Sequence, residues 1–298
     1  MAGRERTAAS GWGLAAGGGL GARALLGAPE RGLAAESAPV AWYVGAGGGP
    51  GWSASMDKAG HNRDTTCSPN RDCGGRVVEG FRWFQDLVPA AGRTFEVTAG
   101  RRVGRLRVEL SATQQTHALD LTFIGITYFD GSERAPRIAD SPYTSRSTNT
   151  VGDLTTRTLS LNFYRDLPLP GARATPYVGA GLGVAFIEVS RLYFHSDYSC
   201  RPGRTCEPPA DRYDSRKSAD LRDVVPAAHL FAGVEFHLSE RLVLDLKFAY
   251  RAVGDLAARR TYLQHEFPGL TFHESVTGIR QGSVLLGVRY TWVAGVAP

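Results

Sequence analysis

Charged side chains recur at alternate positions within apolar stretches of this 298-residue chain. Eight of them fall on one phase of those stretches, with both signs present: Glu96, Arg105, Arg107, Glu109, Glu235, Asp245, Lys247 and Arg289. Residues of one phase share one face of a sheet. Such a track could transport ions or catalyse a reaction. Because an unpaired buried charge is costly, we predict instead a structural network of ion pairs that fills the interior.

The four cysteines form two pairs with the same spacing. Five residues separate the members of each pair: Cys67 and Cys73, Cys200 and Cys206. Equal spacing within predicted surface loops favours two local disulfides and an oxidising compartment. A metal site that borrows His61 or His195 is the weaker alternative, because no Cys-x-x-Cys spacing occurs. No metal and no cofactor are therefore predicted.

Motifs of known enzymes are missing from the sequence. It has no phosphate-binding loop, no Gly-x-Ser-x-Gly, no zinc-protease helix and no dinucleotide fingerprint. His273 and Ser275 are close neighbours, but a catalytic serine also needs a positioned base and an acid that orients it. No catalytic residue is predicted.

A period of two indicates the strands that would position these side chains. Seven stretches alternate apolar and polar or small residues: 41–52, 93–113, 158–163, 175–186, 229–236, 242–250 and 281–292. The stretch 93–113 turns near Val103 and Gly104 and reads as a hairpin, which gives eight strands. In 175–186, large apolar residues such as Leu182 alternate with glycines such as Gly183.

Short and long connections alternate along the chain. Short turns follow the second, fourth and sixth strands, whereas the other links span roughly 40, 42, 35 and 26 residues. This order predicts an all-β, eight-stranded, antiparallel up-and-down barrel with four long loops at one end. Two segments are ambiguous. A helical face in 77–88 indicates a helix on the barrel rim, and if 77–88 and 119–129 were both membrane strands the barrel would have ten.

The apolar face continues through all eight strands, with aromatic residues near the strand ends. No run of about 18 apolar residues occurs, which excludes a spanning helix. An eight-stranded barrel has a narrow interior, so glycines on one face leave room for bulky inward side chains. We therefore predict that the apolar face meets lipid. A soluble, lipocalin-like barrel with the faces reversed is the alternative.

Three segments resemble a known group of proteins. "GRTFEVTAGRRVGRLRVELSATQ", "ATPYVGAGLGVAF" and "GSVLLGVRYTW" are similar to the small bacterial outer-membrane barrels of OmpA and OmpX type, including porin-like barrel domains. The resemblance covers about 41 to 293 and rests on pattern. Those proteins commonly end on an aromatic residue, whereas "VAGVAP" follows Trp292 here.

The resemblance implies a location and a role. It implies that 39–298 form an integral barrel of the bacterial outer membrane, with a non-enzymatic structural or surface-interaction role through its loops. A narrow passive channel is the alternative, and a lipid A-modifying barrel enzyme is less favoured. Expected partners are outer-membrane lipid, lipopolysaccharide and the barrel assembly machinery, with no nucleic acid. The positive charge is almost all arginine, which suits phosphate contacts.

The first 38 residues differ in composition from the rest. Arg4 and Arg6 provide a basic start, and small residues near 34–38 could be cleaved, but the apolar core is rich in glycine and broken by Arg23. We expect an atypical signal peptide or a disordered tail here.

Overall fold

The structure is a computed structural model that describes residues 40–62, 80–133, 141–167 and 173–293. The expected signal segment at 1–38, together with Cys67 and Cys73, lies outside the described residues. The described chain contains thirteen strands and one short 3-10 helix, η1 (Ala210–Tyr213). These ranges contain no candidate for a membrane-spanning helix.

Eight strands form a closed ring. β1 pairs with β4 and β13, and the antiparallel ladder continues through β5, β7, β8, β9 and β10 back to β13. Their bounds are β1 (Val40–Ser53), β4 (Gly92–Val103), β5 (Leu106–Tyr128), β7 (Asp153–Asp166), β8 (Ala174–Cys200), β9 (Ser215–His237), β10 (Leu242–Val253) and β13 (Arg280–Val293). Closure leaves the ring without an edge strand. The expected eight-stranded up-and-down ring is confirmed.

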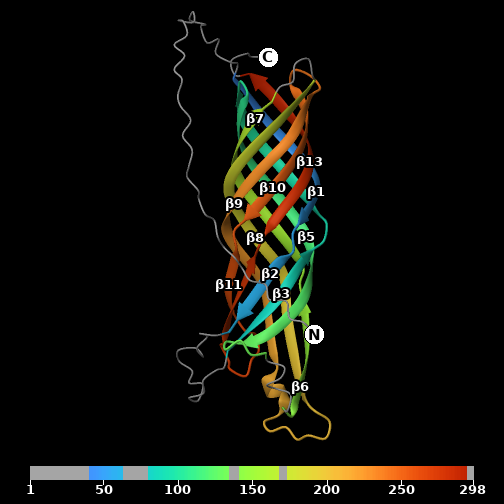
Figure 1. Cartoon of the computed structure of the whole chain (residues 1–298), viewed down its shortest axis with the longest axis vertical. Coiled ribbons are helices and arrows are strands. Elements are labelled where there is room, and N and C mark those ends of the chain that lie inside the picture. The colour runs from blue at the N-terminus through green and yellow to red at the C-terminus, as the bar shows by residue number, and fades with distance from the viewer. Residues whose placement is uncertain (1–39, 63–79, 134–140, 168–172, 294–298) are drawn as a thin grey trace, which may run out of the picture. The chain divides into compact units, whose positions relative to one another are not determined.

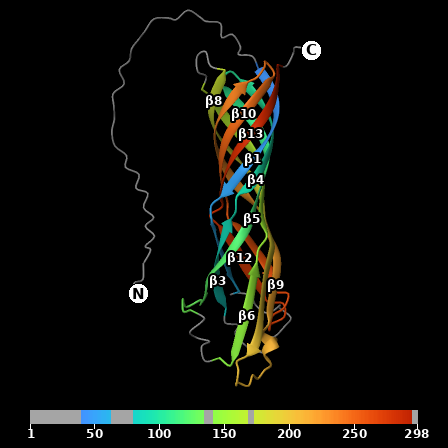
Figure 2. The same cartoon turned by 90° about the vertical axis from the view of Figure 1, so that its right-hand side faces the viewer.

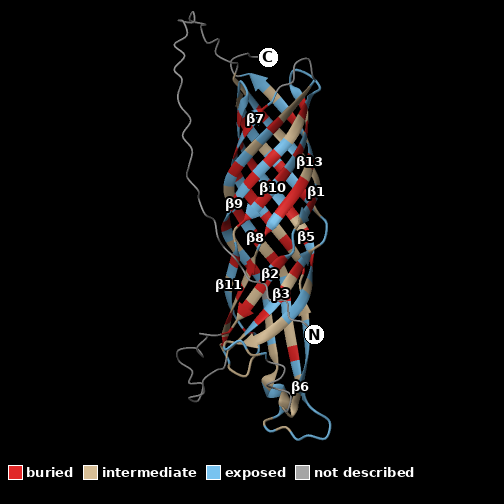
Figure 3. Cartoon of the chain, viewed as in Figure 1, coloured by how far each residue is buried: buried red, intermediate tan, exposed pale blue. Residues whose placement is uncertain are grey.

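The two faces of the ring have the predicted chemistry. Figure 3 shows buried and exposed residues alternating along the ring strands. Leu161, Leu182 and Leu246 are exposed on the outside, whereas the alternate positions Ser160 and Asp245 are buried inside. Polar residues therefore fill the ring and apolar residues cover it, which excludes the reversed, lipocalin-like arrangement.

The long links contain strands, and their description as loops was wrong. The additional strands are β2 (Met56–His61), β3 (Phe81–Pro89), β6 (Tyr143–Thr150), β11 (Leu256–Thr261) and β12 (Thr271–Thr277). With the distal parts of β5, β8 and β9 they form what we call the extension, in the lower half of Figure 1. The expected helix is wrong over 81–88, which belong to the strand β3 and pair with distal β5, whereas 77–79 lie outside the described residues. The ten-stranded alternative is also wrong, since this pair lies outside the ring.

The extension continues the ring after a break in five strands. Two residues interrupt each of the pairs β1/β2, β3/β4, β6/β7, β10/β11 and β12/β13. Backbone hydrogen bonds link the breaks to one another and to unbroken strands, as from the Ala90 amide to the Ala118 carbonyl and from Gly152 to Ser190. The breaks therefore lie at one level, where they separate the ring from the extension (Figure 2).

One seam of the extension stays open. β11 lies beside β9, and hydrogen bonds between Arg216 and Gln264 join the two segments. β6 pairs with β8, and distal β5 pairs with β3, but no ladder joins β5 to β6 among the described residues. The polar strand β6 is exposed along most of its length. The extension is therefore a cylinder with a gap between β5 and β6.

A layer of apolar side chains closes the interior at the level of the breaks. Its residues come from β2, β3, β5, from β7 to β12 without β6, and from the break after β12, and we call it the apolar septum: Met56, Leu87, Leu119, Leu154, Ala185, Ile187, Val189, Leu192, Leu221, Val225, Ala227, Val253, Leu256, Val276 and Ile279. All are buried. The septum divides the polar interior of the ring from the interior of the extension.

The glycine face of β8 generates the first prediction. A Cβ atom on Gly183 would lie 2.2 Å from the backbone oxygen of Leu159 and 2.8 Å from the Cα of Ser160, whereas one on Gly125 would meet nothing within 4 Å. We expect Gly183→Val to lower the free energy of unfolding by about 1 to 3 kcal/mol through overpacking. Gly125→Val is the matched control. Urea unfolding in lipid vesicles measures both, and equal midpoints would contradict the close approach of β7 and β8.

Candidate functional site

Glu235 is the centre of the ion-pair network in the ring. The guanidinium groups of Arg102, Arg107 and Arg289 all reach this buried carboxylate. Arg107 also pairs with Asp166 at 2.9 Å, and Arg102 pairs with it at 3.1 Å. Three cations around one carboxylate are balanced only because further acids lie within reach.

A second group of charges adjoins the first. Lys247 pairs with Glu96 and lies 3.6 Å from Glu109. Arg289, which pairs with Glu235 in the first group, also pairs with Asp245 at 2.8 Å. Tyrosine hydroxyls also donate hydrogen bonds to two of these carboxylates. They donate at 2.8 to 3.0 Å, from Tyr43 and Tyr164 to Glu109 and from Tyr177 to Asp245.

The structure brings together seven of the eight predicted charges. Arg105 is the exception, and its inclusion was wrong. It lies in the turn after Gly104, whose φ is +58°, before β5 begins, and its side chain is exposed. Arg102 on the adjoining strand supplies the cation instead. Asp166 was missed because it ends β7 beside a turn, and the tyrosines were missed because they read as apolar members of the pattern.

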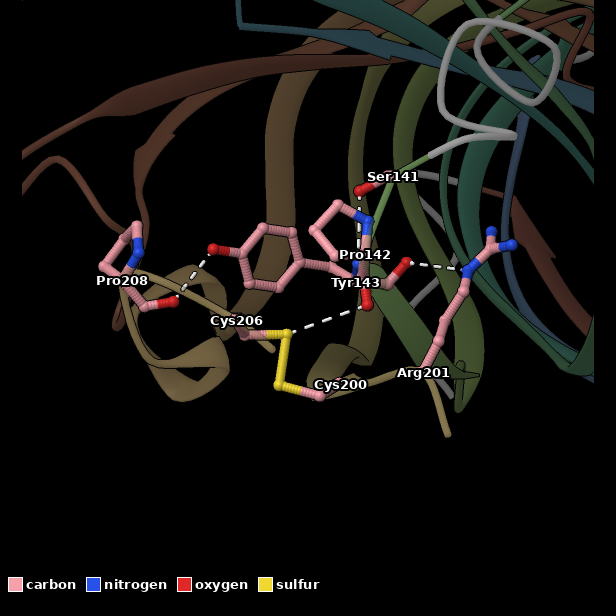
Figure 4. Close-up of a disulfide and its surroundings, with 7 residues drawn as sticks. All are labelled: Ser141, Pro142, Tyr143, Cys200, Arg201, Cys206 and Pro208. Atoms are coloured by element: carbon pink, nitrogen blue, oxygen red, sulfur yellow. Dashed lines mark hydrogen bonds between the residues drawn. A yellow bond between two sulfur atoms is a disulfide. The ribbon is translucent and has the colours of Figure 1, made fainter. Parts of the chain in front are cut away.

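A disulfide closes the tip of the extension. Cys200, at the end of β8, is bonded to Cys206, as predicted (Figure 4). Beside it, the hydroxyl of Tyr143 at the start of β6 donates to the carbonyl of Pro208 at 2.8 Å. The disulfide loop therefore holds one end of the otherwise exposed strand β6. The pairing of Cys67 with Cys73 stays a prediction.

Two lysines share one carboxylate inside the extension, next to the septum. Lys58 of β2 lies 2.8 Å from Glu274 of β12, and Lys217 of β9 lies 3.1 Å from the same Glu274 oxygen. Lys58 also donates to Gln85 at 2.8 Å. This lysine–glutamate cluster carries two positive charges and one negative charge.

Aromatic rings surround the ammonium group of Lys217. Its Nζ lies 3.7 Å from the ring centroid of Trp83, 5.0 Å from that of Phe272 and 5.2 Å from that of Phe194. Burial lowers the pKa of Lys217 to about 8, although Glu274 opposes the shift. Burial raises the pKa of Glu274, but the two lysines lower it more, and the resulting pKa is about 2. Near neutral pH, the cluster therefore keeps its net positive charge.

A pocket of about 360 Å³ opens beside this cluster. Its apolar lining comes from β5 at one side of the gap and from the segments behind the gap: Phe81, Trp83, Phe123, Ile126, Phe194 and Tyr262. Lys217 and Gln85 reach it from the wall, and Ser147 and Asn149 reach it from β6. Sequence reasoning missed this pocket, because its residues come from distant segments whose pairing only the fold reveals.

The network around Glu235 generates a prediction about stability. Glu235→Gln leaves three arginines with less negative charge in a buried position, so we expect the barrel to lose about 3 to 5 kcal/mol. Glu188 pairs with the exposed Arg222 on the outside of the chain. Glu188→Gln should cost no more than about 1 kcal/mol. Urea unfolding in lipid vesicles compares the two, and similar losses would show that the Glu235 network is not enclosed.

The shifted pKa of Lys217 can be measured directly, because the chain has only three lysines. Lys58 and Lys247 are buried within ion pairs, whereas Lys217 faces the pocket. We expect reductive methylation with isotope-labelled formaldehyde to modify Lys217 first. Because burial disfavours the ammonium form, the NMR signal of the label should titrate near pH 8. A signal that moves only above about pH 10 would contradict the desolvated environment.

No protein-family model matches the chain. The curated relatives include uncharacterized proteins of Brucella abortus (strain 2308) and Brucella melitensis, each 34% identical over 97 residues, or 33% of this chain. The chain spans 30% of the length of these relatives. They assign no function.

The similar solved structures are outer-membrane and surface proteins. Neisserial surface protein A is 14% identical, with 84% of this chain and 96% of that chain covered and a TM-score of 0.40. OprG from Pseudomonas aeruginosa is 14% identical, with coverages of 87% and 98% and a TM-score of 0.42. The outer-membrane protease OmpT from Escherichia coli is 9% identical, with coverages of 84% and 97% and a TM-score of 0.35. The chain is similar to small outer-membrane β-barrel proteins, and its own strand pairing establishes the eight-stranded ring.

Proposed function

We propose that the chain is an integral, non-conducting β-barrel of the bacterial outer membrane that acts through its extension at the cell surface. One observation carries this proposal: the interior is closed twice, by the ion-pair network and by the apolar septum. An open pore needs a continuous path for water, and each layer interrupts such a path. The closed interior favours surface interaction over the alternative of a narrow passive channel.

The outer surface supports the position of the ring in lipid. Exposed apolar side chains cover the ring from Trp42 and Trp292 at one end to Trp52 and Phe186 near the breaks. The outside of the extension has exposed apolar residues too, such as Leu263, but it also carries exposed charges, from acidic and basic residues alike: Asp57, Arg82, Asp220, Arg222, Arg259 and Arg260. The appearance of these charges beyond the breaks fits a membrane boundary at that level.

The exposed arginines of the extension support lipopolysaccharide as a partner. Arginine binds phosphate with two parallel hydrogen bonds, and the extension leaves the membrane where lipid headgroups lie. Outer-membrane lipid around the ring and the barrel assembly machinery complete the proposed partners. The chain ends after β13 with residues 294–298, outside the described ranges.

We also propose that the barrel is not an enzyme. His273 and Ser275 are alternate residues of β12, and the ring of His273 stacks on that of His61 at 4.9 Å between centroids. This stacking on the outer face of the extension accounts for His273 structurally. A lipid A-modifying activity would need an acid and a base placed on Ser275, and the structure supplies no such arrangement among the described residues.

Insertion into lipid tests the proposed location. Leu182 on the ring and Leu263 on the extension are similarly exposed, at 71% and 68%. We expect Leu182→Arg to cost about 2 to 4 kcal/mol and to impair insertion, because the charge would face hydrocarbon. Leu263→Arg should insert normally. The mobility shift on heating in SDS measures the folded fraction, and equal tolerance of both substitutions would contradict the assigned boundary.

Conductance tests the closed interior. We expect the purified barrel in planar lipid bilayers to show no steady conductance, because both closures persist in the folded protein. Insertion is verified on the same preparation by the mobility shift on heating. Steady currents from the unmodified, inserted protein would overturn the proposal and favour the channel.

A further inference from the structure

We propose that the pocket between β5 and β6 binds a small molecule that combines an apolar body of ring size with one anionic group, and that Lys217 holds the anion. This inference rests on the proposed function to the extent that the extension faces the medium. It names the class of ligand that the extension takes.

The pocket has the size and lining of a ligand site. Its volume of about 360 Å³ falls within the usual range for small-molecule pockets, which are mostly apolar with a few placed polar groups. Trp83, Phe194 and Tyr262 present aromatic surface to it, and Ser147 and Asn149 present polar groups from β6. A flat apolar body could therefore pack against the rings.

The charge around the pocket selects an anion. Lys58 and Lys217 carry two positive charges, and Glu274, their shared partner, carries one negative charge. The other charged groups nearby do not change this balance: Glu266 pairs with Arg212, and burial lowers the pKa of His265 to about 4, which leaves it neutral. The cluster therefore holds one positive charge in excess.

Lys217 has donor capacity left for a ligand. An ammonium group has three N–H donors. Among the described residues, the ammonium group of Lys217 donates to one hydrogen-bond acceptor, the carboxylate of Glu274. Its other contacts are with the faces of Trp83, Phe194 and Phe272. A carboxylate in the pocket would receive a charge-assisted hydrogen bond in a site of low polarity.

The gap gives the ligand a way in, and the septum ends its path. Phe123 of β5 and Ser147 of β6 line the pocket and are exposed to solvent, so the pocket is reached between these strands. On the other side of the lysine–glutamate cluster, Leu154, Leu221 and Val276 of the septum are buried completely. The septum therefore closes the inner end of the pocket, so that a bound ligand is retained and has no route into the interior of the ring.

Three probes with one ring system test the charge preference. Naphthoate, naphthamide and naphthylmethylammonium share a flat apolar body and differ in charge. Isothermal titration with the full chain in lipid nanodiscs, against empty nanodiscs, should show binding in the order naphthoate, naphthamide, naphthylmethylammonium. The amide oxygen can still accept a hydrogen bond from the ammonium group but forms no ion pair with it, so we expect the amide to bind about tenfold more weakly than the carboxylate.

Variants of adjacent residues separate the pocket from the surface. Lys217→Met keeps the length of the side chain and should reduce naphthoate affinity about tenfold and naphthamide affinity by less, because the amide loses a hydrogen bond but no ion pair. Arg216→Gln removes the same charge from the exposed, opposite face of β9 and should change neither. Ser147→Trp fills the pocket and should abolish binding of both probes. Thr148→Trp, on the other face of β6, should leave binding intact.

The outcomes distinguish failure of the inference from failure of the proposed function. Equal affinity for all three probes, or an equal effect of Lys217→Met and Arg216→Gln, would overturn the role of Lys217. Absence of naphthoate binding by a folded barrel, verified by its mobility shift on heating, would overturn the pocket as an anion site. Neither result involves conductance, which alone decides whether the barrel is closed.

Discussion

The narrowness of an eight-stranded ring is the constraint on which the rest of the structure depends. So few strands enclose little more than the volume of their own inward side chains, so each large polar group must find a partner inside. Glu235 meets three arginines, and Glu109 meets Lys247 and two tyrosines. The glycines of β8 follow from the same constraint, since Tyr164 and Asn162 occupy the space next to them. The ion pairs and the glycines therefore both follow from the limited space inside the ring.

Alternation along the strands made much of the ring predictable. A period of two places Leu161 and Asn162 on opposite faces without knowledge of the neighbours, and seven of the inward charges follow from it. The same rule fails at turns, where Arg105 leaves the strand and Arg102 takes its place. It also fails for β3, whose apolar residues fit a helix and a strand equally well until pairing with β5 decides. The pocket was out of reach because Trp83, Lys217 and Glu274 meet only through pairing across long sequence separations.

The septum gives the two halves of the molecule different chemistry. On the ring side, charges are enclosed and balanced, so the interior is stable and inert. On the extension side, a small cluster keeps one unbalanced positive charge next to aromatic surface and an open seam. Stability and recognition are therefore separated by a layer of apolar contacts, and substitutions on one side are expected to leave the other intact.

The five strand breaks also define how the native chain opens locally. The extension strands β2, β3, β6, β11 and β12 have six to nine residues, whereas the ring strands have twelve or more. Opening that starts at the free edge of β6 removes short ladders one by one and stops at the breaks, where the closed ring begins. Amide hydrogens on the two sides of this level therefore belong to separate cooperative units, with the slowest exchange in the ring.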